Sequence, residues 1–185
     1  MTKPPKMTKT EMVTLVAEAA AWVNQMREQY RPVATSLAEP QKTKMRPFFP
    51  TELLERVRVV DLSETGEHLP YPPFYSRVKA GGSRLVPDAA HMDSIPFVDL
   101  VVFGQKPTDR TLFNALVHVT QFTILGVEQF MELYVRGLIK TGRYFLIPLE
   151  DHAYHLDTRF TKDPSDIFSV AEEVQQWAQG GRYAR

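Results

Sequence analysis

Three polar side chains, Asn114, His118 and Gln121, share one stripe of a predicted helix in the middle of the chain. Their spacing is i, i+4 and i+7, which puts them on one face of an α-helix. The residues between them are mostly apolar, so the stripe indicates either the floor of a cleft or a buried hydrogen-bond network. In a cleft, an imidazole can bind a metal or transfer a proton, whereas in a core it is hydrogen-bonded to a neighbouring helix.

The helical second half of the chain must position this stripe. Thr108 can cap the helix that carries it, and Gly126 is a suitable stop at its C-terminal end. Pro148 can occupy the first turn of a later helix. The sequence predicts four helices in this half, over about residues 109–125, 127–140, 148–160 and 163–179.

The first half of the chain is predicted to hold one long helix and a few strands. Thr8 and Glu11 have the spacing of a capping box, so a helix is expected from there to about Tyr30. Pro50 is expected to begin a short helical turn. The other expected elements are a surface loop over 32–50, a strand over 57–62, an extended loop with at most one hairpin over 63–96, and a strand over 97–103.

This order of elements predicts an α+β fold, with a small sheet packed on several helices. We expect a single domain over residues 9–180, with tails at 1–8 and 181–185. The chain has 185 residues, which is enough to bury one core.

The composition limits the kinds of partner that we expect this chain to bind. The chain has 22 Lys and Arg residues against 22 Asp and Glu residues, so it offers no net charge to nucleic acid or to an anionic membrane. It has no cysteine, which excludes disulfides and thiolate-bound zinc. The first residues are basic but no apolar run follows them, so we expect no signal peptide and a cytoplasmic location.

Several segments together resemble the minigluzincin-like proteins, which are small single-domain relatives of gluzincin-type zinc peptidases. In that family a zinc-binding helix precedes a Leu-Gly turn, and a Pro-Leu-Glu segment opens the helix of the third ligand. The resemblance covers about residues 51–160. It is carried by residues 116–122, 125–127, 147–150, 153–154 and 159–160, and upstream by 56–59, 72–75 and the strand 97–103.

The resemblance assigns a role to each position of the degenerate H-E-x-x-H motif. His118 corresponds to the second zinc-binding histidine, and Glu150 corresponds to the third ligand. Asn114 stands where the first histidine would be, and Ala115 stands where the catalytic glutamate would be. A neutral amide oxygen is a poor zinc ligand, and alanine cannot accept a proton from water. We therefore expect no peptidase activity and no cofactor.

Three functional hypotheses follow. The leading hypothesis is a pseudoenzyme, that is, a catalytically disabled relative of zinc peptidases. It either binds an unidentified small molecule or protein or has a structural role. A second is a non-peptidase enzyme in which His118 and Glu150 perform acid–base chemistry on a small molecule. A third is a weak residual metal site on the same two residues. The predicted cleft consists of Asn114, Ala115, His118, Gln121, Glu150 and Tyr154.

Without a metal, a buried Glu150 needs another partner, and His118 is the obvious one. We expect such a pair to raise the pKa of His118, with hydrogen bonds from Asn114 and Gln121.

Other polar residues are weaker candidates. Asp151, His152, His155 and Asp157 are expected on the solvated face of a helix, although His152 and His155 have a spacing that a metal can use. The loop histidines His68 and His91 could supply a missing ligand. The aromatic and Pro-rich segment 71–75 is expected to pack over the core or to dock a partner, and Gly81-Gly82 lacks the context of a phosphate loop.

Overall fold

The structure is a computed structural model that describes residues 7–80 and 92–181. This part of the chain forms seven α-helices and one four-stranded sheet, so the predicted α+β class is confirmed. The helices are α1 (Lys9–Tyr30), α2 (Glu39–Met45), α3 (Thr51–Arg56), α4 (Phe74–Ala80), α5 (Asp109–Thr141), α6 (Pro148–Lys162) and α7 (Val170–Gln179). The strands are β1 (Thr35–Ser36), β2 (Arg58–Asp61), β3 (Ser94–Phe97) and β4 (Leu100–Phe103).

The sheet is mixed, with the strand order β1-β2-β4-β3. β2 and β4 are parallel, and each has an antiparallel neighbour on its other side. All four residues of β4 are buried, because its Leu100 and Val102 face one hydrophobic core while Val101 and Phe103 face a second. The sheet is therefore covered on both faces, and β1 and β3 are its edge strands.

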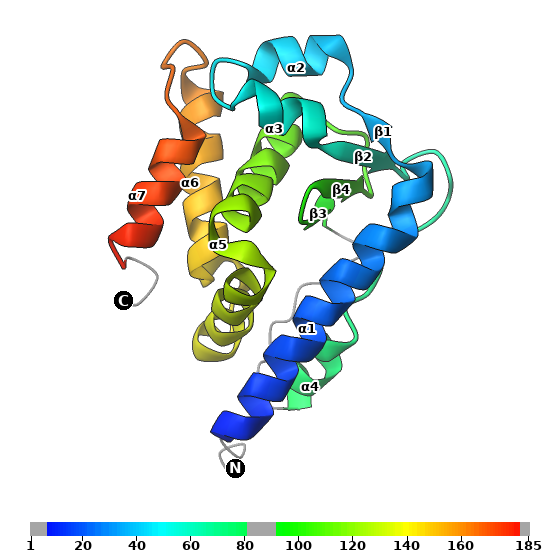
Figure 1. The fold of residues 1–185 in the computed structure, drawn as a ribbon, viewed down its shortest axis with the longest axis vertical. Helices are drawn as coiled ribbons and strands as arrows, with labels where there is room; N and C mark the ends of the chain where they lie inside the picture. Colours follow the sequence, from blue (N-terminus) through cyan, green and yellow to red (C-terminus); the bar gives the residue numbers. More distant parts are fainter. Residues whose placement is uncertain (1–6, 81–91, 182–185) are drawn as a thin grey trace.

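Helix α5 lies in the middle of the molecule, with α6 and α7 on one side and the sheet on the other (Figure 1). Thr108 caps its N-terminus by accepting a hydrogen bond from the Thr111 amide at 3.2 Å. The helix is sharply kinked at Gly126, whose φ of 77° is a conformation that L-residues rarely adopt. The helix break predicted at this glycine is thus confirmed.

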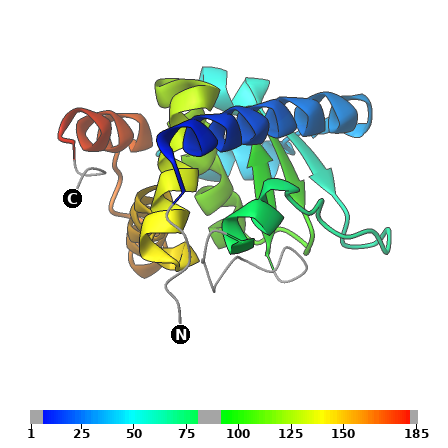
Figure 2. The same cartoon turned by 90° about the horizontal axis from the view of Figure 1, so that it is seen from below.

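Helix α1 begins with the predicted capping box between Thr8 and Glu11 and runs along the sheet (Figure 2). Its buried stripe includes Leu15, Ala19 and Val23. Near its C-terminal end, Arg27 donates two hydrogen bonds to the carboxylate of Asp99, at 2.6 and 2.8 Å. Asp99 sits in the turn between β3 and β4, so this bidentate pair fixes the edge hairpin to α1.

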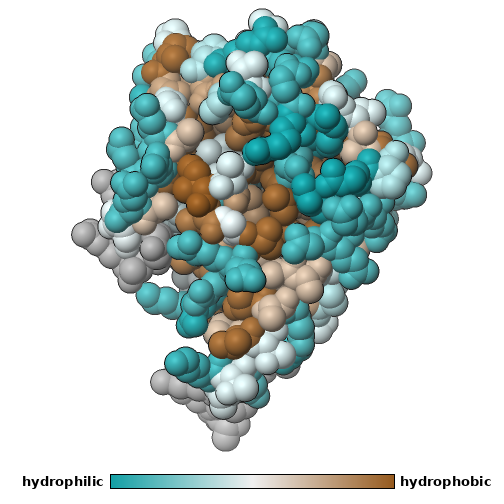
Figure 3. Space-filling model, viewed as in Figure 1, coloured by the Kyte–Doolittle hydropathy of each residue, from teal (hydrophilic) through white to brown (hydrophobic). Residues whose placement is uncertain are grey.

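The face shown in Figure 3 is mostly hydrophilic, but hydrophobic residues gather near its middle. A groove between α1 and the second half of α5 is lined in part by Val16, Ala20, Leu125 and Val127. None of the helices in the described residues is both long and apolar enough to cross a membrane.

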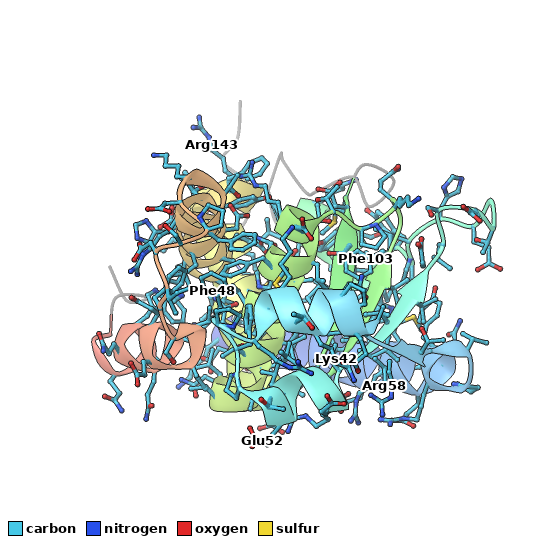
Figure 4. The ribbon with its side chains drawn as sticks, turned by 90° about the horizontal axis from the view of Figure 1, so that it is seen from above. Lys42, Phe48, Glu52, Arg58, Phe103 and Arg143 are labelled. Atoms are coloured by element: carbon cyan, nitrogen blue, oxygen red, sulfur yellow. The ribbon has the colours of Figure 1, made fainter. Side chains whose placement is uncertain are left out.

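The second core is an aromatic cluster that joins the N-terminal segments to the helical half. Phe48, labelled in Figure 4, makes edge-to-face contacts with Phe113, Phe160 and Phe168. Phe113 and Phe160 stack on each other with centroids 4.3 Å apart, which ties α5 to α6. Ala153 is fully buried in the same cluster, where its small side chain lets the two helices approach.

Two predictions for the first half are wrong. Residues 32–50 do not form only a loop, because β1 and α2 lie there. Pro40 occupies the first turn of α2, where its missing N–H costs nothing. The segment 63–96 contains α4 and β3 as well as extended chain, although its residues 81–91 lie outside the described part.

Two further boundaries differ from prediction. The run 97–103 is not one strand but the end of a hairpin, which turns at Val98 with a φ of 63°. Such a φ is rare for a β-branched residue, so the apolar run gave no sign of a turn. The last helix starts at Val170, because the Asp163 side chain accepts hydrogen bonds from Ser165 and closes a turn first.

We expect Asp99→Asn to lower the free energy of unfolding at pH 7 by about 1–2 kcal/mol, because it removes a charge-assisted pair. Burial raises the pKa of Asp99, but the hydrogen bonds from Arg27 outweigh it and hold this pKa below its usual value. The contribution is therefore present above the unfolded carboxyl pKa of about 3.9 and is lost as pH falls through the folded value. Urea unfolding at pH 7 and pH 3 measures it.

The control is Glu28→Gln, which removes an exposed carboxylate that also contacts Arg27. It should leave unfolding nearly unchanged at both pH values. An Asp99→Asn variant as stable as wild type at pH 7 would contradict an anchoring role for the pair.

Candidate functional site

His118 and Glu150 lie against each other where α5 packs on α6. The Nε2 atom of His118 is 3.4 Å from Oε2 of Glu150, and their side chains are only 5% and 6% exposed. On the other side of the ring, Nδ1 of His118 lies 2.8 Å from Oε1 of Gln121. The convergence of an imidazole on one helix with a carboxylate on the next, as predicted, is therefore present.

The hydrogen bonds of Gln121 determine where the protons lie. Its Nε2 donates to the carbonyl oxygen of Leu149 at 3.1 Å, so its Oε1 is the atom that faces His118. Nδ1 of His118 must then carry a hydrogen. Because a bare Nε2 would repel the carboxylate, one further proton has to lie between Nε2 and Glu150.

The charge state of His118 follows from the same contacts. Burial on its own lowers the pKa of His118, but the Glu150 charge and the hydrogen bonds that the ring donates to Glu150 and Gln121 outweigh it. The pKa of His118 is therefore raised above its usual value, as the sequence predicted. The contacts of His118 therefore favour its imidazolium form more than burial alone would.

The separation of the pair also matches the geometry of two metal ligands. A charge-assisted N–H···O bond is commonly about 2.7–2.9 Å long. Two ligand atoms about 2.1 Å from a zinc ion at a tetrahedral angle lie about 3.4 Å apart. His118 and Glu150 thus have the spacing of two zinc ligands, with Gln121 orienting the ring through Nδ1 as an outer partner does in metal sites.

The pair lies at the wall of a cavity of about 70 Å³. Most of its lining is apolar and comes from α1, α4, β3 and α5. Phe122 and Phe130 stack with centroids 3.7 Å apart on either side of the Gly126 kink, so both halves of α5 line it. The apolar lining includes Trp22, Phe74, Ile95, Phe122, Phe130 and Met131. This combination of an apolar chamber and a few convergent polar groups is typical of a small-molecule site.

Three tyrosines add hydroxyl groups to the cavity. The hydroxyls of Tyr75 and Tyr134 are 2.5 Å apart, and Tyr144 lines the same cavity as Glu150. Burial raises the pKa of each of these tyrosines, and the negative charge of Glu150 raises it further. All three remain neutral hydroxyls, and since one of Tyr75 and Tyr134 donates to the other, two hydroxyl hydrogens remain for a ligand or for the carboxylate.

Asn114 also lines the cavity, but its hydrogen bond goes elsewhere. Its Nδ2 donates to Oδ2 of Asp157 at 2.8 Å, and Arg110 pairs with Oδ1 of the same carboxylate at 3.1 Å. The expected hydrogen bond from Asn114 to the His118–Glu150 pair is replaced by this one. Asp157 is buried, so the hydrogen bonds from Asn114 and Arg110 supply much of the compensation that a buried charge requires.

The other predicted cleft residues are distributed differently. Ala115 and Gln121 are fully buried and do not line the cavity. Tyr154 lines a neighbouring pocket of about 290 Å³ with Asp93, Arg110 and Asp157. Burial, followed by the nearby carboxylates, raises the pKa of Tyr154 to about 12.

The polar cluster on α6 is not a solvated face throughout. His152 is buried and stacks on Trp177 of α7, with centroids 4.8 Å apart and planes 5° from parallel. Asp157 is buried beside α5, whereas Asp151 and His155 are exposed, as expected. The hydrophobic face of α6 is therefore wider than its sequence indicated.

The loop candidates do not join the site. His68 is exposed, whereas His91 and Gly81-Gly82 lie outside the described residues. In the segment 71–75, Tyr75 is buried over the core and Tyr71 is half exposed. Within residues 7–80 and 92–181, no group of three or more His, Asp or Glu side chains is arranged to hold a metal ion.

The sequence analysis did not predict that the cavity tyrosines Tyr75, Tyr134 and Tyr144, or Arg110, would belong to the site. Tyr75 and Tyr134 are 59 residues apart, and no spacing rule connects them. Arg110 lies one turn before Asn114 on the polar stripe, so extending the i, i+4 pattern would have found it. The edge strand β3, which contributes Ser94 and Ile95, was hidden in the predicted loop.

Searches against protein-family models, curated proteins and solved structures found no match for this chain.

We expect Glu150→Gln to lower the pKa of His118 below its usual value, because burial then acts without the opposing carboxylate. The raised wild-type pKa means that the stability from this pair is fully present below the unfolded pKa of about 6.5 and is lost as pH rises through the folded value. At pH 6 the variant should be about 1–3 kcal/mol less stable, and this gap should shrink at higher pH. Imidazole NMR titration and urea unfolding measure the two effects.

Glu128→Gln is the matched control, because Glu128 is an exposed residue of the same helix α5. It should leave the pKa of His118 and the pH dependence of stability as in wild type. An unchanged His118 pKa in Glu150→Gln would rule out the pair as its cause.

Proposed function

We propose that this chain is a minigluzincin-like protein without peptidase chemistry, which binds a small, mainly apolar molecule in the cavity beside His118 and Glu150. The observation that carries the proposal is the buried pair at the wall of an apolar chamber. An apolar cavity with a few fixed polar groups is the usual form of a small-molecule site.

Three features support kinship with the zinc peptidases. His118 and Glu150 converge from two helices, and their 3.4 Å separation suits two ligands of one zinc ion. An antiparallel edge strand, β3, lines the cavity beside the helix that carries His118. A small residue, Ala153, follows Glu150 by three positions and is fully buried between the helices.

The residues present do not fit a working zinc site. Asn114, at the position of the first ligand, uses its amide to bond Asp157, and two ligands are fewer than the three that catalytic zinc usually takes. Ala115, at the position of the general base, is buried and carries no ionisable group. Binding rather than hydrolysis is the role that these residues can perform.

Acid–base catalysis is the weaker alternative. Nδ1 of His118 is engaged by Gln121 and Nε2 faces Glu150, so neither nitrogen is directed to a substrate proton. A general base needs a nitrogen or oxygen within reach of the proton it removes. The pair is better suited to present a fixed dipole to a ligand in the cavity.

The binding proposal predicts that branched alcohols of four to six carbons stabilise the protein, since each has an apolar body and one hydroxyl. A ligand at 100 times its Kd should add about 2.7 kcal/mol to the free energy of unfolding. Ile95→Phe should abolish this gain by filling the cavity from β3. Ile167→Phe is the control, because Ile167 is 56% exposed and lies outside the cavity. Thermal shift measures the gain, and equal gains in both variants would contradict the proposal.

The kinship predicts that Asn114→His alone creates a zinc site, by completing three ligands with His118 and Glu150. This single change is preferable to adding Ala115→Glu, which would bury a carboxylate in the core. Native mass spectrometry should find one zinc per folded variant chain and none in Asn114→His combined with His118→Ala. A folded Asn114→His variant that binds no zinc would contradict the shared geometry.

A further inference from the structure

The cavity lies beside a second pocket, and the two differ in chemistry. The inner cavity and the outer pocket of about 290 Å³ share Asn114 and Ser94. The outer pocket contains Arg110, Asp157 and Asp93, so its lining carries charges of both signs. The inner cavity is mostly apolar.

The order of these groups follows the axis of α5. Arg110, Asn114, His118 and Phe122 are each one turn apart, and the helix rises about 6 Å for every four residues. The stripe therefore runs from a charged end, past an amide and the His118–Glu150 pair, to an aromatic end. It is polar as far as His118 and apolar beyond it.

The charged end suits a zwitterion better than an anion. Arg110 has five N–H donors, and the structure gives one of them to Asp157, through Nη2. Its guanidinium side chain is 53% exposed, so it can bind a carboxylate. Asp93 adds an exposed negative charge on the same pocket, which repels a simple anion but attracts an ammonium group.

The inner cavity limits the size of the apolar part. A water-sized atom needs about 10–15 Å³ of such space, so about 70 Å³ accommodates roughly five atoms. The side chains of leucine and methionine have four heavy atoms beyond the α-carbon. Tryptophan has ten, and alanine has one, which would leave most of the apolar wall without a contact.

We propose that the ligand of this site is a free α-amino acid with a short apolar side chain, such as leucine or methionine. Its carboxylate binds Arg110, its ammonium group lies near Asp93 and the Asn114 oxygen, and its side chain enters the inner cavity. The inference rests on the proposed small-molecule function and specifies its ligand.

Calorimetry with matched ligands tests the proposal. L-leucine and L-methionine should bind, whereas L-alanine and L-tryptophan should bind at least tenfold more weakly. N-acetyl-L-leucine lacks the ammonium group and L-leucinamide lacks the carboxylate, so each should also lose at least tenfold. Equal binding of all the leucine derivatives would overturn the role of the charged end.

Variants separate the two pockets. Arg110→Gln should weaken leucine binding at least tenfold and leave 3-methylbutan-1-ol, which has only the apolar part and a hydroxyl, unaffected. Asp93→Asn should do the same without disturbing the buried Asp157. Arg136→Gln is the control, because Arg136 is an exposed residue of α5 paired with Glu132.

Different experimental results would overturn the amino-acid inference and the small-molecule function. If 3-methylbutan-1-ol binds and leucine binds no better, the amino-acid inference is overturned while the small-molecule function remains. If Ile95→Phe leaves the binding of every probe unchanged, both are overturned.

Discussion

A buried imidazole facing a buried carboxylate is the constraint around which this molecule is organised. Removing two ionisable groups from water is costly unless each finds a partner and its remaining lone pairs and protons are satisfied. His118 and Glu150 meet that condition only when α5 and α6 pack in one register, with Gln121 bridging from His118 to the Leu149 carbonyl. The same register stacks Phe113 on Phe160 and buries Ala153. Polar specificity and hydrophobic packing therefore select a single arrangement of the two helices.

The sheet and α1 complete what the two helices begin. Edge strand β3 supplies one wall of the cavity, and its turn is held to α1 by the two hydrogen bonds between Arg27 and Asp99. Because β4 is buried on both faces, the edge hairpin cannot shift without disturbing two cores at once. One wall of the cavity is a helix, and another is this anchored strand. The cavity can therefore keep its shape without a ligand, which lowers the entropic cost of ordering the site when a ligand binds.

The features that could be predicted from sequence were those with local signatures. Thr8 with Glu11 set the start of α1, Gly126 marked the kink, and the predicted pairing of His118 with Glu150 is present. The features that could not be predicted depend on distant contacts or on rare backbone states. Val98 turns the chain at a φ that its residue type disfavours. Asn114 is hydrogen-bonded to Asp157, which lies 43 residues away in the sequence, and Tyr75 is hydrogen-bonded to a tyrosine of another helix. In each case the conformation is determined by tertiary contacts, which produce no periodic pattern in the sequence.

The kink at Gly126 separates two halves of α5 that line different parts of the site. Residues before it supply the polar floor of the site, and Phe130, Met131 and Tyr134 after it supply much of the apolar roof. Since each residue turns an α-helix by about 100°, inserting or deleting one residue at the kink would rotate roof against floor by that angle. The identity of the roof side chains, by contrast, can change while the floor keeps its hydrogen bonds. Descendants of such a scaffold could therefore acquire new ligand preferences by point substitution in the roof, whereas changes in the length of this helix would be eliminated.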